Sequence, residues 1–457
     1  MSVNLQKFTI TGLHGNKARR VSATIRNNTL ILVGENGSGK TTFLRMLFHF
    51  LAGRWLSLAQ FRFENIEAVV NDKKFGLSRD ELSRGLKKVD SRFLANLPPS
   101  IRRQLRPFIE AGQLERIPRE LERLGVYGYN PDLFVQADLF DSATEGKGAS
   151  TDMQRRVQEL RSIFGSQILY LPTYRRIERE LSSILEGLDP EDPRRTRSRT
   201  RARETDESFI ELVEFGMKDV QAAVDRAREN IKEFARQSLN SLTQKYLGSI
   251  VNKEYQQVAE NEIADASEDI VRAVLDRIDE TILTTAQKAD LFNAINSARS
   301  AGSPTEHDKI LCHYFLKLRS FQAALQEKER SISAFCALCS EYIVDKRFVY
   351  DRATFQFSIV PTDASQNPGP IDLSDLSSGE KQIVSLFSHL YLSGVKRYFV
   401  LIDEPELSLS VPWQRRFLVD IRKGEFCSGL VAVTHSPFIY DNELRSCAHS
   451  LGEFVSI

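Results

Sequence analysis

The chain has 457 residues, 27% of them charged, and its acidic and basic side chains nearly cancel to a formal net charge of +1. This length allows two to four domains. The balanced charge excludes a global field that would attract nucleic acid or a membrane surface. The five cysteines lack a disulfide-type spacing, which is typical of a reducing compartment. No signal-peptide pattern opens the chain and no apolar run is long enough to span a bilayer, so the sequence predicts a cytoplasmic protein without membrane contact.

The first part of the chain predicts strands. Segments 5–10 and 21–25 alternate between apolar and polar residues, and the apolar run 30–33 follows them. Residues 61–75 predict a hairpin that turns at Asn71-Asp72. Residues 78–125 are charged and helical in pattern, with an interruption at Pro98-Pro99, and indicate an inserted helical lobe.

A glycine-rich loop follows the apolar run at 30–33. It fits G-x-x-x-x-G-K-[ST] with Gly34, Gly39, Lys40 and Thr41, and a helical pattern comes next. Glycines let backbone N–H groups point at phosphate oxygens, and a helix N-terminus adds partial positive charge. We expect Lys40 to neutralise the β and γ phosphates of ATP and Thr41 to ligate Mg²⁺. A loop that only turns the chain would not require Lys-Thr at this offset.

A buried-type strand is predicted at 167–171, where it breaks at Pro172 into a turn that carries Arg175, Arg176 and Arg179. Ligands gather at strand ends in open α/β sheets, so these arginines are candidates to reach the nucleotide or a neighbouring subunit. Surface salt bridging is the alternative.

A basic low-complexity run continues to residue 205, with arginines at 194, 195, 197, 199, 201 and 203. Its composition is that of a linker, which is usually solvated and disordered. The other interpretation is a surface that grips phosphates or an acidic protein.

A helical region is predicted over 206–345. Apolar residues alternate at gaps of four and three in a heptad seam that predicts an arm of roughly 30 Å; its members are Val213, Met217, Val220, Val224, Ala227, Ile231 and Phe234. Two further periodic sets are Ile270, Val274, Ile278 and Ile282, and Leu311, Phe315, Leu318 and Leu325. Cys336-x-x-Cys339 lies in this region, and without a second ligand pair it favours buried cysteines over a zinc site.

Three pieces near the C-terminus carry further chemistry. Residues 376–382 place serines and a glycine ahead of an amphipathic helix, which predicts a second anion-binding helix N-terminus. The strand 398–403 ends in Asp403 and Glu404, which we expect beside Mg²⁺ and beside the attacking water, respectively. A third buried strand ends at His435, a candidate partner of the γ-phosphate.

These motifs, in this order, resemble those of ATP-binding-cassette (ABC) ATPases, in particular the branch of structural-maintenance, Rad50-like, RecF-like and overcoming-lysogenisation (OLD) proteins. The resemblance implies an α/β P-loop ATPase fold with an N-terminal antiparallel β subdomain, split by an α-helical or coiled-coil insertion. It also implies the following division: 1–75, N-terminal half of the ATPase domain; 76–165, helical insert; 166–180, ATPase strand and arginine turn; 181–205, basic linker; 206–345, helical domain; 346–457, C-terminal half of the ATPase domain.

The resemblance further implies the roles of individual residues. Glu404 and His435 would be catalytic, as the Walker B glutamate and the switch histidine, and Thr41 and Asp403 would hold Mg²⁺. Residues 406–410 would form the D-loop. The ATP-binding residues would come from the Walker A loop and the signature, namely Gly34, Asn36, Gly37, Ser38, Gly39, Lys40, Thr41, Thr42, Ser377, Ser378, Gly379 and Glu380. ATP would be sandwiched between two chains, so the active protein would be a homo-oligomer.

Two departures from the pattern stand out. Ser410 occupies the place where many relatives have a histidine, and Gln60 is the nearest candidate for the magnesium-ligating glutamine after the first helix.

Size, the Leu-Pro-Thr-Tyr-Arg-Arg strand end and the compact insert resemble the stand-alone ATPases of anti-phage operons, in particular the AriA ATPases of PARIS systems and their PtuA relatives. That resemblance implies a sensor that sequesters a separate Toprim-type nuclease and releases it on detecting a phage-encoded acidic or DNA-mimicking trigger. Only residues 436–457 follow His435, which leaves no room for a nuclease domain. The alternative is a RecF-like or Rad50-like repair ATPase that binds DNA.

Overall fold

The computed structural model describes residues 3–16, 18–86, 99–111, 113, 116–117, 120, 123, 159–160, 162–172, 209–211, 216–257, 268–276, 284–300, 305–363, 369–395 and 397–456. Contacts divide the chain into two compact units. The first comprises Met1–Glu214 and Val395–Ile457, and the second is Phe215–Gly394. Each unit is described by itself. No helix among the described residues is long and apolar enough to cross a membrane.

A six-stranded parallel sheet forms the centre of the first unit. Its order is β12 (Ala448–Ser450), β3 (Thr29–Val33), β11 (Cys427–Thr434), β10 (Tyr398–Asp403), β6 (Gln167–Leu171) and β7 (Phe209–Glu211). The central strands are almost wholly buried, which explains why they read as continuous apolar runs in the sequence. Because all the strands are parallel, β3, β10 and β11 deliver the residues that follow them to one edge of the sheet.

A five-stranded antiparallel sheet forms the second layer of this unit. Its order is β13 (Val455–Ser456), β2 (Arg20–Thr24), β1 (Leu5–Thr11), β4 (Asn65–Val70) and β5 (Lys73–Ser78). The β4–β5 hairpin turns at Asn71 and Asp72, whose φ values of 48° and 63° fit a two-residue hairpin turn. The hairpin and the two N-terminal strands predicted from the sequence are thereby confirmed.

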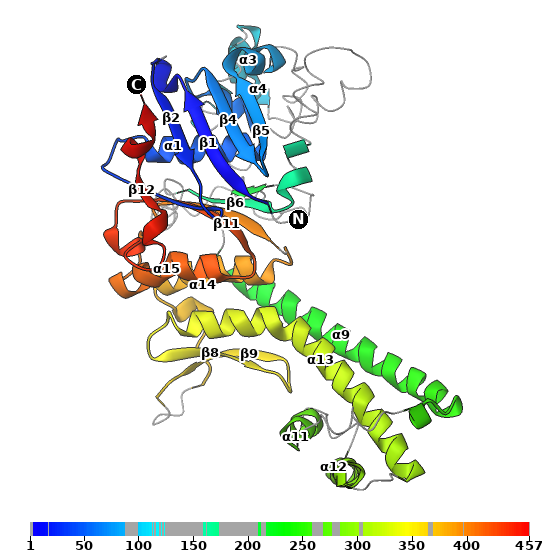
Figure 1. The fold of residues 1–457 in the computed structure, drawn as a ribbon. Helices are drawn as coiled ribbons and strands as arrows, with labels where there is room; N and C mark the ends of the chain where they lie inside the picture. The colour runs from blue at the N-terminus through cyan, green and yellow to red at the C-terminus, as the bar shows by residue number, and fades with distance from the viewer. Residues whose placement is uncertain are drawn as a thin grey trace. The chain divides into compact units, whose positions relative to one another are not determined.

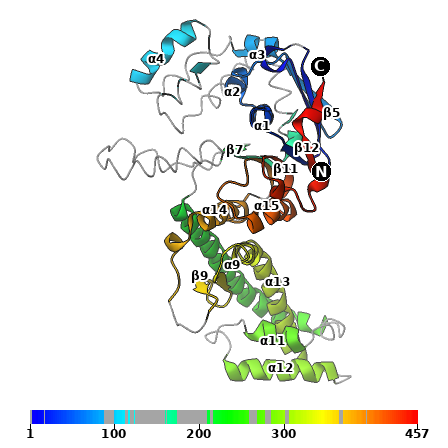
Figure 2. The same cartoon turned by 90° about the vertical axis from the view of Figure 1, so that its left-hand side faces the viewer.

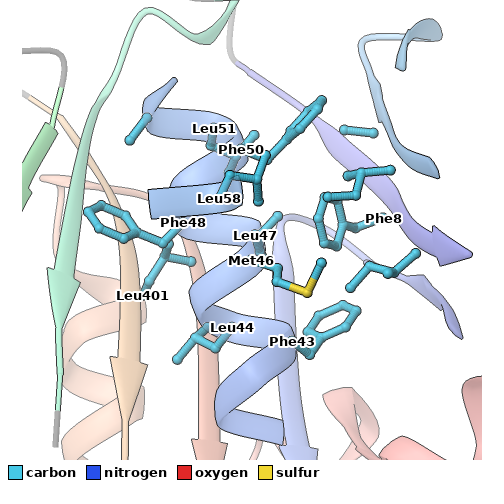
Figure 3. Packing of buried hydrophobic residues seen from close by; sticks show 14 of the residues in the cluster. Phe8, Phe43, Leu44, Met46, Leu47, Phe48, Phe50, Leu51, Leu58 and Leu401 are labelled. Atoms are coloured by element: carbon cyan, nitrogen blue, oxygen red, sulfur yellow. The ribbon is translucent and has the colours of Figure 1, made fainter. Parts of the chain in front are cut away.

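Helix α1 (Lys40–Ala52) packs between the two sheets. In Figure 3, Phe8 of β1 and Leu401 of β10 lie on opposite sides of this helix. Phe8 and Phe43 meet edge to face, with ring centroids 5.4 Å apart, and both are fully buried. This packing holds α1 in place, and the glycine-rich loop leads directly into the N-terminus of that helix. The remaining elements of the unit are α2 (Trp55–Ala59), α3 (Arg79–Leu86), α4 (Pro99–Glu110), α15 (Val411–Lys423) and the short 3₁₀ turns Leu13–Gly15, Pro437–Ile439, Arg445–Cys447 and Leu451–Phe454.

Two long helices, α9 (Met217–Val251) and α13 (Glu306–Ser340), run side by side in the second unit (Figures 1 and 2). At 35 residues, α9 is about 50 Å long, so the arm is longer than the roughly 30 Å predicted. The predicted seam is buried at Val220, Val224 and Ile231. Beyond that seam the helix continues because Leu242 packs on a distal cluster and the Tyr246 hydroxyl donates to the Ile310 carbonyl at 2.9 Å.

Helices α11 (Glu268–Asp276) and α12 (Thr285–Ser300) pack on α13 and enclose that distal cluster (Figure 2). The predicted periodic residues Phe315, Leu318 and Leu325 are buried. Val213, Ile278 and Ile282 lie outside the described residues. The second unit also contains the 3₁₀ turns Glu254–Gln257 and Leu373–Asp375, the hairpin β8 (Lys346–Asp351) and β9 (Gln356–Pro361), and α14 (Ser378–Leu392).

Contacts group residues 346–394 with the long helices, whereas the sequence interpretation assigns 346–457 to the C-terminal half of the ATPase domain. A grouping by contacts reports packing and not the modular origin of a segment, so the predicted domain boundaries stay predictions. The fold class itself is confirmed, because a mixed α/β P-loop fold with an antiparallel N-terminal sheet carries a helical insertion between β7 and β10.

Candidate functional site

The glycine-rich loop joins β3 to α1 and has the backbone that its glycines permit. Gly34, Gly37 and Gly39 have φ values of 148°, 80° and 99°, a region that residues with a Cβ rarely adopt. A Cβ at Gly37 would meet no atom within 4 Å, so the loop has open space on that side. Consecutive N–H groups and the α1 N-terminus therefore form a cradle suited to an anion.

The Lys40 side chain folds back over this loop. Its Nζ donates to the carbonyl oxygens of Gly34 and Glu35, each at 2.8 Å, and to Ser38 Oγ at 3.3 Å. Burial lowers the pKa of Lys40, and the carboxylates of Glu404, Asp403 and Glu406 oppose that shift. Lys40 is therefore a buried cation that carboxylates stabilise.

Thr41 and Asp403 bring the loop and the central strand together. The Thr41 hydroxyl donates to Asp403 Oδ1 at 3.0 Å, and Asp403 is only 3% exposed. A hydroxyl and a carboxylate are the hard oxygen ligands that Mg²⁺ prefers, and Mg²⁺ commonly takes only one or two protein ligands beside phosphates and water. Within the described residues no cluster of three or more His, Cys, Asp or Glu is arranged to hold a metal. The residues present thus fit a magnesium ion shared with phosphates.

Glu404 follows Asp403 in a left-handed backbone conformation, with φ of 51°. Burial first, and then the neighbouring Glu406 and Asp403, raise the pKa of Glu404 to about 7, against the pull of Lys40. The His435 Nε2 atom lies 3.0 Å from Glu404 Oε1. A carboxyl group with this pKa is suited to accept a proton near neutral pH.

Glu406 also belongs to this site, although the sequence indicates only that it lies in a loop. It accepts hydrogen bonds from Thr434, His435 and Ser436 at the end of β11. Gln414 of α15 contacts the same turn. The one local signal for such a role was a second glutamate two residues after Glu404.

The signature segment lies in the second unit, where it begins α14. Ser377 is the N-cap residue, its backbone N–H donates to Glu380 Oε2 at 2.8 Å, and its hydroxyl accepts from the Glu380 N–H. Lys346 of β8 pairs with the same carboxylate at 3.2 Å. Although burial pushes the pKa of Glu380 upward, the bonds from Ser377 and Lys346 hold it below its ordinary value. The Glu380 carboxylate thus serves its own helix terminus, and its contact with ATP stays a prediction.

The other predicted residues have the following places. Asn36 is exposed, Ser38 and Thr42 are half-buried, Ser378 and Gly379 open α14, and Gln60 ends α2. Arg175, Arg176, Arg179 and the arginines between 194 and 203 lie outside the described residues.

Cys336 and Cys339 are buried, and burial raises the pKa of Cys336 to about 12. Such thiols stay protonated, which suits packing rather than metal ligation.

A glycine loop before α1, a buried lysine and two acidic residues at the end of a neighbouring parallel strand together define a P-loop ATPase. Comparison with family models agrees: residues 30–441 match the family described as "AAA domain, putative AbiEii toxin, Type IV TA system". The chain belongs to this family.

Other comparisons add less. No match is found among the curated proteins. One similar solved structure is the Smc head domain with an extended coiled coil, bound to the C-terminal domain of ScpA, from Pyrococcus furiosus. It is 12% identical, the match covers 96% of this chain and 91% of that chain, and the TM-score is 0.33. A similarity at this level supports no argument about function.

Proposed function

We propose that the protein hydrolyses ATP with Mg²⁺, and that ATP binding controls its assembly with a partner in a bacterial anti-phage defence system. The observation that carries the enzymatic part is the 3.0 Å contact between Glu404 and His435, at the sheet edge that also presents Lys40 and the Thr41–Asp403 pair. A binding scaffold needs the phosphate cradle but not a carboxyl group poised to take a proton.

The roles of the residues follow from this arrangement. The loop N–H groups and Lys40 hold the phosphates, and Thr41 and Asp403 hold Mg²⁺, which when bound neutralises phosphate charge. Glu404 accepts the proton of the attacking water. His435 holds the Glu404 carboxylate in one orientation through the Nε2 contact.

The oligomeric part of the proposal rests on the signature segment. Ser377 caps a helix of 15 residues that begins with Ser378 and Gly379, and the N-terminus of such a helix favours anions. In the proposed homo-oligomer, the signature of one chain covers the ATP held by another.

The defence role is supported by the family description, which names a putative AbiEii toxin and a type IV TA system. A toxin–antitoxin setting favours a protein that works with an effector over a stand-alone repair ATPase. The proposed partner is a separate Toprim-type nuclease that the ATP-bound oligomer holds and that an acidic, DNA-mimicking trigger releases.

The test uses Glu404→Gln, which retains the ATP-binding residues but removes the base. This variant is isolated from its host in the presence of ATP and treated with nuclease, and the mass of the complex is measured by light scattering. Lys40→Ala, which should not bind ATP, is the control. The proposal predicts that Glu404→Gln forms an oligomer with a stoichiometric protein partner and that Lys40→Ala does not. Bound nucleic acid without a protein partner would contradict it and indicate a DNA clamp, and so would equal recovery of the partner with Lys40→Ala.

A further inference from the structure

The Glu406 carboxylate binds three consecutive residues at the end of β11. Its Oε1 accepts the backbone N–H of His435 at 2.8 Å and that of Ser436 at 3.0 Å, while Oε2 accepts the Thr434 hydroxyl at 2.8 Å. Both oxygens therefore bind these residues, and hydrogen bonds to a charged acceptor are stronger than neutral ones.

Gln414 adds a second connection between the same two segments. The Ser436 hydroxyl donates to Gln414 Oε1 at 2.6 Å, and Gln414 Nε2 donates to the Leu409 carbonyl at 2.9 Å. Residues 406–409, which follow Glu404, and residues 434–436 are thus joined at two points. The backbone that carries His435 cannot shift without breaking bonds to the segment that carries Glu404.

We propose that Glu406 is a positioning residue for ATP hydrolysis: it fixes the turn from which His435 projects, so that the imidazole meets Glu404. The proposal rests on the hydrolysis proposed above. Glu406 acts by holding His435 and, through a hydrogen bond, the Glu404 carboxyl; it is not itself the proton acceptor.

The presence of a glutamate at position 406 supports this role over simple stabilisation of a turn. Asp403, Glu404 and Glu406 place three carboxyl groups within four positions, and the charges of Glu406 and Asp403 both disfavour the ionised form of Glu404. A glutamine would remove that repulsion, but it has a single acceptor oxygen for bonds that now use two. The two oxygens of Glu406 bond all three donors of the turn, which a neutral side chain of the same length does not.

The test is a double-mutant cycle on ATPase kinetics with Glu406→Ala, His435→Ala and the double variant; Glu406→Gln serves as the conservative variant, and Glu443→Gln is the exposed control. We expect Glu406→Ala to lower kcat about 10-fold to 100-fold, the scale of a small misplacement, with KM for ATP within about twofold. Glu406→Gln keeps an acceptor for the two N–H groups and should recover part of kcat. In the His435→Ala background, Glu406→Ala should cost less than it does beside the wild-type histidine.

Additive losses in the cycle would overturn the proposal, and so would a Glu406→Ala variant with wild-type kcat or equal losses in Glu406→Ala and Glu406→Gln. If Glu406→Ala does not fold, the same comparison is made with Glu406→Gln, once with His435 present and once with His435→Ala. A wild-type protein without ATPase activity would contradict the proposed function instead, so the two failures are distinguishable.

Discussion

The Thr41 hydroxyl donates to Asp403 Oδ1 at 3.0 Å although the two residues are 362 positions apart. Thr41 is the second residue of helix α1 and Asp403 ends β10, and the register of β3, β11 and β10 brings the two elements to the same sheet edge. The contact unites the first and last parts of the chain in one candidate magnesium site.

Asp403→Asn should abolish Mg²⁺-dependent hydrolysis, with kcat lowered at least about 100-fold, because the amide keeps the shape but removes the charge that holds the ion. The measurement is phosphate release against Mg²⁺ concentration. Asp441→Asn, at an exposed ion pair with Arg445, is the matched control and should leave the rate unchanged. A wild-type Mg²⁺ dependence in Asp403→Asn would contradict the assignment of the ion.

Lys40→Ala should weaken ATP binding at least about 100-fold, because the buried cation that lies over the phosphate cradle is lost. A fluorescent ATP analogue titrated into the protein measures the dissociation constant. Lys423→Ala removes a lysine that is 65% exposed and pairs with Glu443, and it should bind as the wild type does. Equal affinity of Lys40→Ala and the wild type would refute the role of the loop.

Much of this site was predictable from the sequence because its signals are local. The loop spacing around Lys40 and the apolar strand before Asp403 each lie within a few consecutive residues. The capping box at Ser377 and Glu380 is readable in the same way, since the pattern S-x-x-E begins a helix. Continuous apolar strands likewise predicted the buried parallel sheet.

The contacts of Glu406 were not predictable, because they depend on how β10 and β11 pair and where α15 begins. Glu406 bonds residues 28 to 30 positions away, and only the register of the sheet brings them together. The pairing of Lys346 of β8 with Glu380 of α14 joins residues 34 positions apart, and no local pattern in the sequence indicates it. The length of α9 was underestimated because its second half packs through few apolar residues, so the heptad signal stops while the helix continues.

Lys346→Met should destabilise the start of α14 by about 1–3 kcal/mol, because it leaves the buried Glu380 carboxylate without its cation. Amide hydrogen exchange of α14, followed by mass spectrometry, measures the loss. Adding Glu380→Gln removes the unpaired charge and preserves the capping box, so the double variant should recover part of the protection. An unchanged exchange rate in Lys346→Met would show that the pair contributes nothing.

His389 should lower the stability of the protein as the pH falls below about 6.5. Burial lowers the pKa of His389 to about 4, whereas an unfolded histidine has a pKa near 6.5. Between these values the unfolded state binds the extra proton, so the free energy of unfolding decreases as the pH falls, by about 1 kcal/mol between pH 7.5 and 5.5 for this group.

Urea unfolding of the wild type and of His389→Gln at pH 7.5 and pH 5.5 isolates that contribution. The free energy of unfolding at pH 5.5, relative to its value at pH 7.5, should be about 1 kcal/mol higher in the variant than in the wild type, since the other titrating groups are common to both. Equal changes in the two proteins would contradict the assignment to His389.

The most direct test of the ATPase mechanism is the nucleotide bound to Glu404→Gln after incubation with ATP and Mg²⁺. Glutamine has the size of the glutamate but cannot accept the proton of the water, so hydrolysis should fall at least about 100-fold while binding persists. Chromatography of the extracted nucleotide should then show ATP in Glu404→Gln and ADP in the wild type. Wild-type turnover in Glu404→Gln would contradict the mechanism.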